Sequence, residues 1–131
     1  MLQGQSTTGT SSISQVAAAE ALSGGPDEAV MLEEFRRRRD LVCERWQALP
    51  DVSLVVPEGA FYVFPKVEAP GMSSEDLAIE LLKGGVLCSP GSAFGPSGEG
   101  HLRFAYTISR EDISRGMDKV ESVLNSLRND A

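Results

Sequence analysis

The sequence predicts an α/β two-layer sandwich, and three observations lead to this fold class. Apolar residues recur at helical spacing in two long segments, from Met31 to Leu49 and from Ile113 to Leu127, which is typical of helices with one buried face. Short runs of β-branched and aromatic residues stand between the helical segments. Gly, Pro and Ser separate these runs. The expected order is α-α-β-β-α-β-β-α, with a small mixed sheet of about four strands covered by the helices.

Two helices are expected in the N-terminal part of the chain. Residues 1–11 are polar and show no periodicity, so we expect an extended segment there. Ser12 and Gln15 predict a capping box that begins a helix reaching Leu22. Pro26 begins the second helix, since proline suits a first-turn position. Its apolar residues at helical spacing are Met31, Phe35, Val42, Trp46 and Leu49. Arg36 to Arg39 cover all sides of this helix, which favours a solvated, salt-bridged surface over a basic binding face.

Two strands and a third helix are expected next. Residues 53–56 and 61–64 are β-prone, and the Pro-Glu-Gly between them predicts a tight turn or a kink. Ser73, followed by acidic residues, predicts the N-cap of a helix that ends at Gly84.

The remainder of the chain predicts two more strands and a last helix. Residues 86–88 are expected to form a buried strand, and residues 101–106 a second one after a loop rich in Gly, Ser and Pro. Ser109 predicts the cap of the final helix. One apolar stripe follows it, formed by Ile113, Met117, Val120, Leu124 and Leu127.

Composition limits the classes of function. The chain has 131 residues and a formal net charge of −7, so we expect a single domain over residues 1–131 and no nucleic-acid partner. Two cysteines without CxxC spacing and one histidine argue against a metal site. The N-terminus lacks the features of a signal peptide, and no apolar run approaches the length of a membrane span. We expect a cytoplasmic protein with no membrane partner.

Arg103 is the strongest candidate for a binding residue. It lies in the middle of a short strand, directly after the glycine-rich loop. A guanidinium matches a carboxylate with two parallel hydrogen bonds and stays charged at any working pH. The residue type alone leaves a simple ion pair with an Asp or Glu of the chain as the alternative. The glycine-rich loop lacks the Lys-Ser/Thr ending of a phosphate loop, and His101 has no nucleophile signature beside it. We therefore expect no catalytic residue in the chain.

Four segments together resemble a known family. The chain resembles the C-terminal (small) domain of fold-type I pyridoxal-phosphate-dependent aminotransferases in four segments, which follow the order of the family. These segments are QGQSTTGTSSISQVAAAEAL, FRRRRDLV, PEGAFYVFP and GVLCSPGSAFGPSGEGHLRFAY. The likeness extends over residues 2–127 and is greatest to the aspartate aminotransferase group.

The resemblance implies roles for particular residues. HLRFAY places Arg103 at the position that binds the α-carboxylate of the substrate. GAFY places Phe61 or Tyr62 at an aromatic wall beside the substrate, with a plain core aromatic as the alternative. The QSTT stretch places Ser6, Thr7 and Thr8 near the cofactor of the neighbouring subunit in a dimer.

The chain also departs from the family pattern. None of its three lysines, Lys66, Lys83 and Lys119, stands in the context of the lysine that forms the imine with pyridoxal phosphate. We therefore expect a fragment of an enzyme of the aspartate:2-oxoglutarate type that is inactive by itself. Pyridoxal phosphate would belong to the full-length enzyme and would not bind to this chain alone.

The expected ligands are an amino acid and a 2-oxo acid, bound in the full-length enzyme. We also expect a homo-oligomer, because apolar surface on the Ala-rich first helix would lack cover in a fragment. The contact is expected through the first helix or the polar N-terminal segment. Two alternatives are a stand-alone module that binds carboxylates and a purely structural interaction domain.

Overall fold

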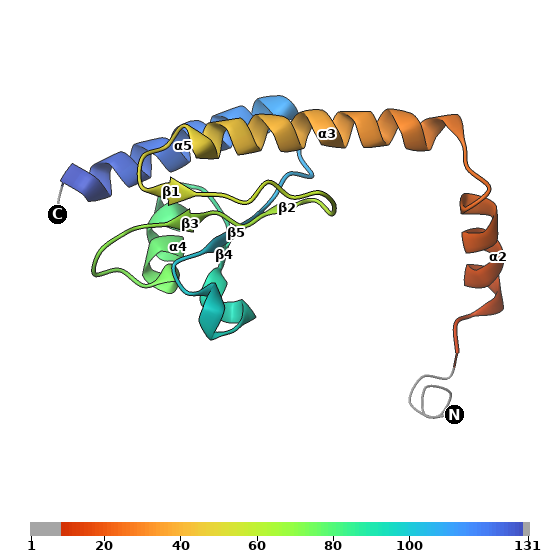
Figure 1. Cartoon of the computed structure of the whole chain (residues 1–131), viewed down its shortest axis with the longest axis horizontal. Helices are drawn as coiled ribbons and strands as arrows, with labels where there is room; N and C mark the ends of the chain where they lie inside the picture. The colour runs from red at the N-terminus through yellow and green to blue at the C-terminus, as the bar shows by residue number, and fades with distance from the viewer. Residues whose placement is uncertain (1–8, 130–131) are drawn as a thin grey trace. The chain divides into compact units, whose positions relative to one another are not determined.

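A computed structural model of the chain describes residues 9–129, apart from the side chain of Pro26. The chain divides into two compact units, Met1–Glu33 and Glu34–Ala131 (Figure 1). The mixed α/β class is confirmed, with helices α2 to α5 and small antiparallel sheets. No helix within residues 9–129 combines the length and the apolarity needed to cross a lipid bilayer.

The first unit contains helix α2 (Ser12–Ala21), whose residues are all exposed. The predicted capping box is wrong. Ser11 occupies the N-cap position without a side-chain hydrogen bond, and Gln15 Nε2 donates to the carbonyl of Thr10 at 2.8 Å. The Gln15 side-chain amide thus donates to the residue directly before the N-cap and forms no capping box with Ser12.

Helix α3 (Pro26–Gln47) begins at the predicted proline and continues into the second unit. From Glu34 onward its buried face consists of Val42, Cys43 and Trp46, whereas Met31 in the first unit is exposed. The arginine run forms the predicted salt-bridged surface. Arg38 pairs with Glu34 at 2.9 Å and Arg39 with Asp40 at 2.7 Å.

Five short strands form two antiparallel sheets in the second unit, in place of the one mixed sheet of about four strands expected from the sequence. β1 (Val52–Ser53) pairs with β3 (Lys66–Val67). β5 (Leu102–Ala105) lies between β2 (Tyr62–Val63) and β4 (Ser89–Pro90). The bridge Lys66↔His101 joins the two sheets.

The strand positions differ from the prediction in two places. Residues 53–56 and 61–64 do not pair with each other. Their partners are β3 and β5 instead, and the chain continues after Pro65 as an additional strand, β3. The segment 86–88 is not a buried strand: Leu87 is 81% exposed, and pairing with β5 begins only at Ser89.

One core lies between the sheets and the helices. α4 (Ser74–Lys83) and α5 (Arg110–Asn129) begin at the predicted caps, with Asp76 N donating to Ser73 Oγ and Asp112 N donating to Ser109 Oγ. α3 and α5 lie along each other above the strands (Figure 1), and Arg45 of α3 pairs with Asp118 of α5 at 2.7 Å. The buried residues of α5 are four of the five predicted ones, Ile113, Met117, Val120 and Leu124.

Strand β5 separates this core from the opposite face of the sheet. Leu102 is fully buried, and the Phe104 ring lies 5.0 Å from that of Trp46, so these two residues face the core. Because side chains alternate along a strand, Arg103 faces the other side. The fold therefore places the candidate arginine on the open face of the central strand.

Candidate functional site

The guanidinium of Arg103 lies between two aromatic rings. Its Cζ atom is 4.5 Å from the ring centroid of Tyr62 and 4.4 Å from that of Phe94. Both distances are within the range of favourable cation–π contacts. Arg103 Nη2 also donates to Ser89 Oγ over a long 3.4 Å. Arg103 is half-buried.

Tyr62 reaches Arg103 because of the strand register. Tyr62 pairs with Ala105, two residues along β5 from Arg103, and residues two apart on a strand share a face. Ser89 on β4 pairs directly with Arg103 from the other side. The two edge strands thus each bring one side chain to the central arginine.

No carboxylate within residues 9–129 forms an ion pair with Arg103. Most other described arginines of the second unit do have such partners, for example Arg45 with Asp118 and Arg115 with Asp112. The ion-pair alternative left open by the sequence therefore finds no support in the described part of the chain. An arginine that stays charged and lacks an internal anion can accept one from outside.

Phe94 comes from the glycine-rich loop, which is folded into two 3₁₀ turns, η1 (Gly91–Phe94) and η2 (Pro96–Gly98). Gly91 and Gly98 lie backbone against backbone. A Cβ atom on either glycine would overlap the carbonyl of the other. Glycine is needed at both positions so that the two turns can close on each other.

The loop is tied to the first turn of α4. Glu99 accepts hydrogen bonds from the backbone N–H of Ser74 at 2.6 Å and from its hydroxyl at 3.1 Å. The backbone N–H of Ser92 donates to the same hydroxyl, and Ser92 Oγ bonds Glu75. The hydrogen bonds from Ser74 hold the pKa of Glu99 below its ordinary value. These contacts fix the base of the loop that carries Phe94.

A row of aromatic rings continues from Phe94 along the open face. The Phe64 ring meets Phe94 edge-on at 5.9 Å and stacks on His101 at 4.9 Å. His101 Nδ1 lies 3.1 Å from the carbonyl oxygen of Glu99. His101 is thus part of the wall beside Arg103, and no hydroxyl or thiol group of residues 9–129 forms a hydrogen bond with its ring.

Only one of the two predicted aromatic residues contacts Arg103. Tyr62 contacts the Arg103 guanidinium, whereas the Phe61 ring packs against Tyr62 at 4.5 Å. Ser6, Thr7 and Thr8 lie outside the described residues. Ser89 and Phe94 were not predicted as site residues. The only signal for Phe94 was a large aromatic residue inside a loop otherwise rich in small residues.

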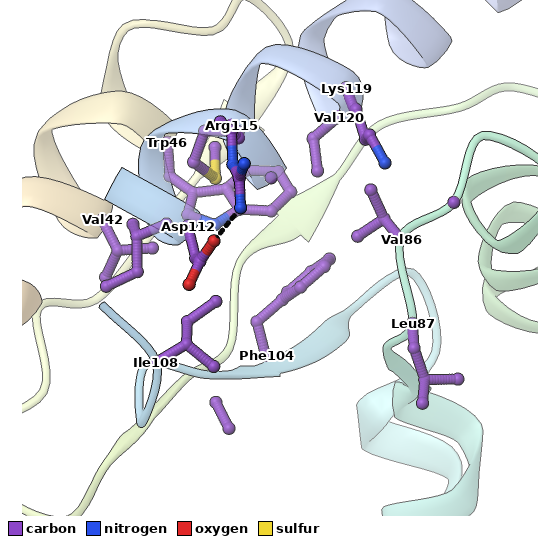
Figure 2. Close-up of a pocket in the computed structure, with 15 residues that line it drawn as sticks. Val42, Trp46, Val86, Leu87, Phe104, Ile108, Asp112, Arg115, Lys119 and Val120 are labelled. Atoms are coloured by element: carbon purple, nitrogen blue, oxygen red, sulfur yellow. Dashed lines mark hydrogen bonds and ion pairs between the residues drawn. The ribbon is translucent and has the colours of Figure 1, made fainter. Parts of the chain in front are cut away.

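A separate groove of about 550 Å³ opens on the core side of β5 (Figure 2). Its floor is apolar, with Trp46 and Phe104, and Leu87 stands at its edge. Lys119 reaches into it, and Asp112 and Arg115 pair at its rim. Arg103 does not line this groove. Within residues 9–129 no cluster of three or more His, Cys, Asp or Glu side chains could hold a metal ion.

Comparison with known proteins gives a consistent result. The family model "Aminotransferase class I and II" matches residues 1–120. A probable N-acetyl-LL-diaminopimelate aminotransferase of Bacillus subtilis is 41% identical over 113 residues, covering 85% of this chain and 28% of the relative. An aspartate aminotransferase of Pyrococcus horikoshii is 40% identical over 114 residues, covering 84% of this chain and 29% of the relative.

Solved structures show the same relationship. An alanine aminotransferase from Pyrococcus furiosus superposes with a TM-score of 0.79 at 31% identity, covering 86% of this chain and 29% of that one. The aspartate aminotransferase from Thermus thermophilus with maleate gives a TM-score of 0.73 at 34% identity, covering 93% and 32%. The chain thus spans less than a third of the length of these proteins.

Proposed function

The chain belongs to the class I and II aminotransferases, and from this premise we propose that Arg103 binds the α-carboxylate of an amino-acid or 2-oxo-acid substrate. The proposal rests on the surroundings of the Arg103 guanidinium. It is held between Tyr62 and Phe94 and forms no ion pair within the described part of the chain. A carboxylate approaching in the guanidinium plane would form two parallel, charge-assisted hydrogen bonds.

Members of this family use pyridoxal phosphate. When bound, this cofactor supplies an electron sink for chemistry at the substrate amine. The groups against Arg103 are two aromatic rings and the Ser89 hydroxyl, none of which is an amine that could form an imine with the cofactor. Of the three lysines, Lys66 is exposed on β3, Lys83 pairs with Glu80, and Lys119 lies in the groove on the other face of β5. These residues do not make up a cofactor site, so we propose that the chain alone has no transaminase activity.

The role of the chain is therefore binding and positioning. A carboxylate fixed by Arg103 would have its Cα atom held at a set distance from the sheet, and such positioning lowers the entropic part of a reaction barrier. Closure of a small domain over the substrate would also exclude water from the reacting groups. In the full-length enzyme the proton transfers would be carried out by residues outside this chain.

The proposed substrate class is dicarboxylic, of the aspartate:2-oxoglutarate type. The support comes from the relatives: several are named aspartate aminotransferases, and the Thermus thermophilus structure contains maleate, a dicarboxylate. Aromatic-amino-acid and alanine aminotransferases are also among the similar proteins.

An NMR titration tests the proposal on the chain as it exists. We expect 2-oxoglutarate to shift the side-chain ¹⁵N signals of Arg103 and to bind with a millimolar dissociation constant. In Arg103→Ala the binding should be lost. Arg103→Lys retains the charge without the planar fork and should bind more weakly than wild type. Equal binding by wild type and Arg103→Ala would contradict the proposal.

A second proposal concerns self-association. Helix α2, which lies in the first unit, has no buried residue, and its apolar side chains Ile13 and Val16 are exposed. Exposed apolar surface commonly promotes association. We propose that the chain forms homo-oligomers through this helix.

A further inference from the structure

The two rings that enclose Arg103 reach it by different routes. Tyr62 belongs to the neighbouring strand, so its position follows from the sheet register. Phe94 does not belong to a strand. It is the last residue of η1, and its place over the guanidinium depends on the fold of the loop between β4 and β5.

Several contacts hold this loop in one conformation. The close approach of Gly91 and Gly98 brings the ends of the two 3₁₀ turns together. Ser92 bonds two residues of the first turn of α4, Ser74 and Glu75. Phe94 itself meets the edge of the Phe64 ring at 5.9 Å. The loop is thus anchored on both sides of Phe94.

We infer that Phe94 is a positioning residue that fixes the guanidinium plane of Arg103 for carboxylate binding. The inference rests on the proposed function of Arg103. Arginine has several rotatable bonds, and immobilising such a side chain on binding costs free energy. With Tyr62 against one part of the guanidinium and Phe94 at 4.4 Å from Cζ, most of this ordering precedes binding. Phe94 acts through Arg103 and takes no part in proton transfer.

The expected loss of affinity without the Phe94 ring follows from the cation–π contact between Phe94 and Arg103. An exposed cation–π interaction contributes enough to change an affinity about two- to fivefold. We therefore expect Phe94→Ala to weaken 2-oxoglutarate binding by about that factor. Phe94→Tyr retains the ring, and Phe94 is half exposed, so the added hydroxyl can point to solvent. This conservative variant should bind like wild type.

The experiment uses the full chain with 2-oxoglutarate as the probe and two readouts. The first is the dissociation constant. The second is the rate of rotation about the Nε–Cζ bond of Arg103 without ligand, measured by ¹⁵N NMR line shapes. A merely structural role of Phe94 would not change this rate in a folded variant. Val55→Ala is the matched control, because Val55 is an exposed apolar residue outside the site. Thermal unfolding confirms that each variant is folded.

The expected result is faster rotation and weaker binding in Phe94→Ala, and wild-type values in Phe94→Tyr and Val55→Ala. Wild-type rotation and affinity in a folded Phe94→Ala would overturn the inference while leaving the role of Arg103 intact. A wild-type chain that does not bind 2-oxoglutarate would contradict the proposed function, and the carboxylate part of this inference with it. The ligand-free rotation rate would then still show whether Phe94 holds the guanidinium.

Discussion

Glu99 and Ser74 close the glycine-rich loop onto helix α4, although 25 positions separate them in the chain. The Glu99 carboxylate accepts both the backbone N–H and the hydroxyl of Ser74, which is almost completely buried. A carboxylate at a helix N-terminus also interacts favourably with the helix dipole. This contact links the loop that carries Phe94 to the rest of the fold.

The first prediction concerns pH. The pKa of Glu99 is lowered from 4.5 by its hydrogen bonds with Ser74. As the pH falls below about 4.5, the unfolded chain takes up a proton before the folded chain does, so the contribution of Glu99 to stability is lost through its folded pKa. Urea midpoints should show wild type more stable than Glu99→Gln at pH 7, with the difference shrinking at pH 3. A difference independent of pH would contradict the role of the carboxylate.

The second prediction concerns the glycine contact inside the loop. Gly91→Ala should destabilise the chain by about 1–3 kcal/mol, because the new Cβ atom would overlap the carbonyl of Gly98 and force the turns apart. Gly59→Ala is the control. Gly59 has open space around it, so its substitution should change the free energy of unfolding by less than about 1 kcal/mol. The two free energies can be compared by urea unfolding, and equal effects would rule out the packing argument.

The third prediction compares two leucines of the second unit. Leu81 on α4 is 0% exposed, and Leu87 is 81% exposed. Leu81→Ala removes core contacts and should cost about 2–5 kcal/mol of unfolding free energy, whereas Leu87→Ala should cost less than about 0.5 kcal/mol. Chemical denaturation measures both. A large loss in Leu87→Ala would mean that residues 86–88 are buried after all.

The fourth prediction concerns self-association through α2. Sedimentation of the wild-type chain should show oligomers at high micromolar concentration. Replacing the exposed Ile13 and Val16 by Asp should shift the distribution to monomer, because charge on this surface opposes association. Val55→Asp, an equally exposed position in the second unit, is the control. A wild-type chain that stays monomeric would disprove this proposal.

The parts of the fold that were predicted correctly depend on local signals. The cap at Ser73, the proline at the start of α3 and the stripe from Ile113 to Leu124 are each encoded within a few turns of one helix. Among the predicted caps only the one at Ser12 was wrong, because the Gln15 side chain donates to an acceptor outside the helix. Residues close together in the sequence were therefore nearly sufficient to predict where the helices begin and which face is buried.

The strand pairing was harder to predict because it is non-local. The partner of β1 is β3, and the neighbour of β2 is β5, so the Pro-Glu-Gly segment does not form the turn of a hairpin. The same applies to the site. Arg103 could be chosen from its strand, but its contact with Phe94 arises only when the loop folds back between two strands. The exposure of Leu87 likewise depends on what packs nearby, which an apolar run does not specify.

The most direct test of the central claim is a crystal structure of the chain grown with 2-oxoglutarate. We expect one carboxylate of the ligand in the plane of the Arg103 guanidinium, with two N–H···O hydrogen bonds and the rings of Tyr62 and Phe94 still in place. Arg103 paired with an Asp or Glu of its own chain, with the ligand bound elsewhere or absent, would contradict it.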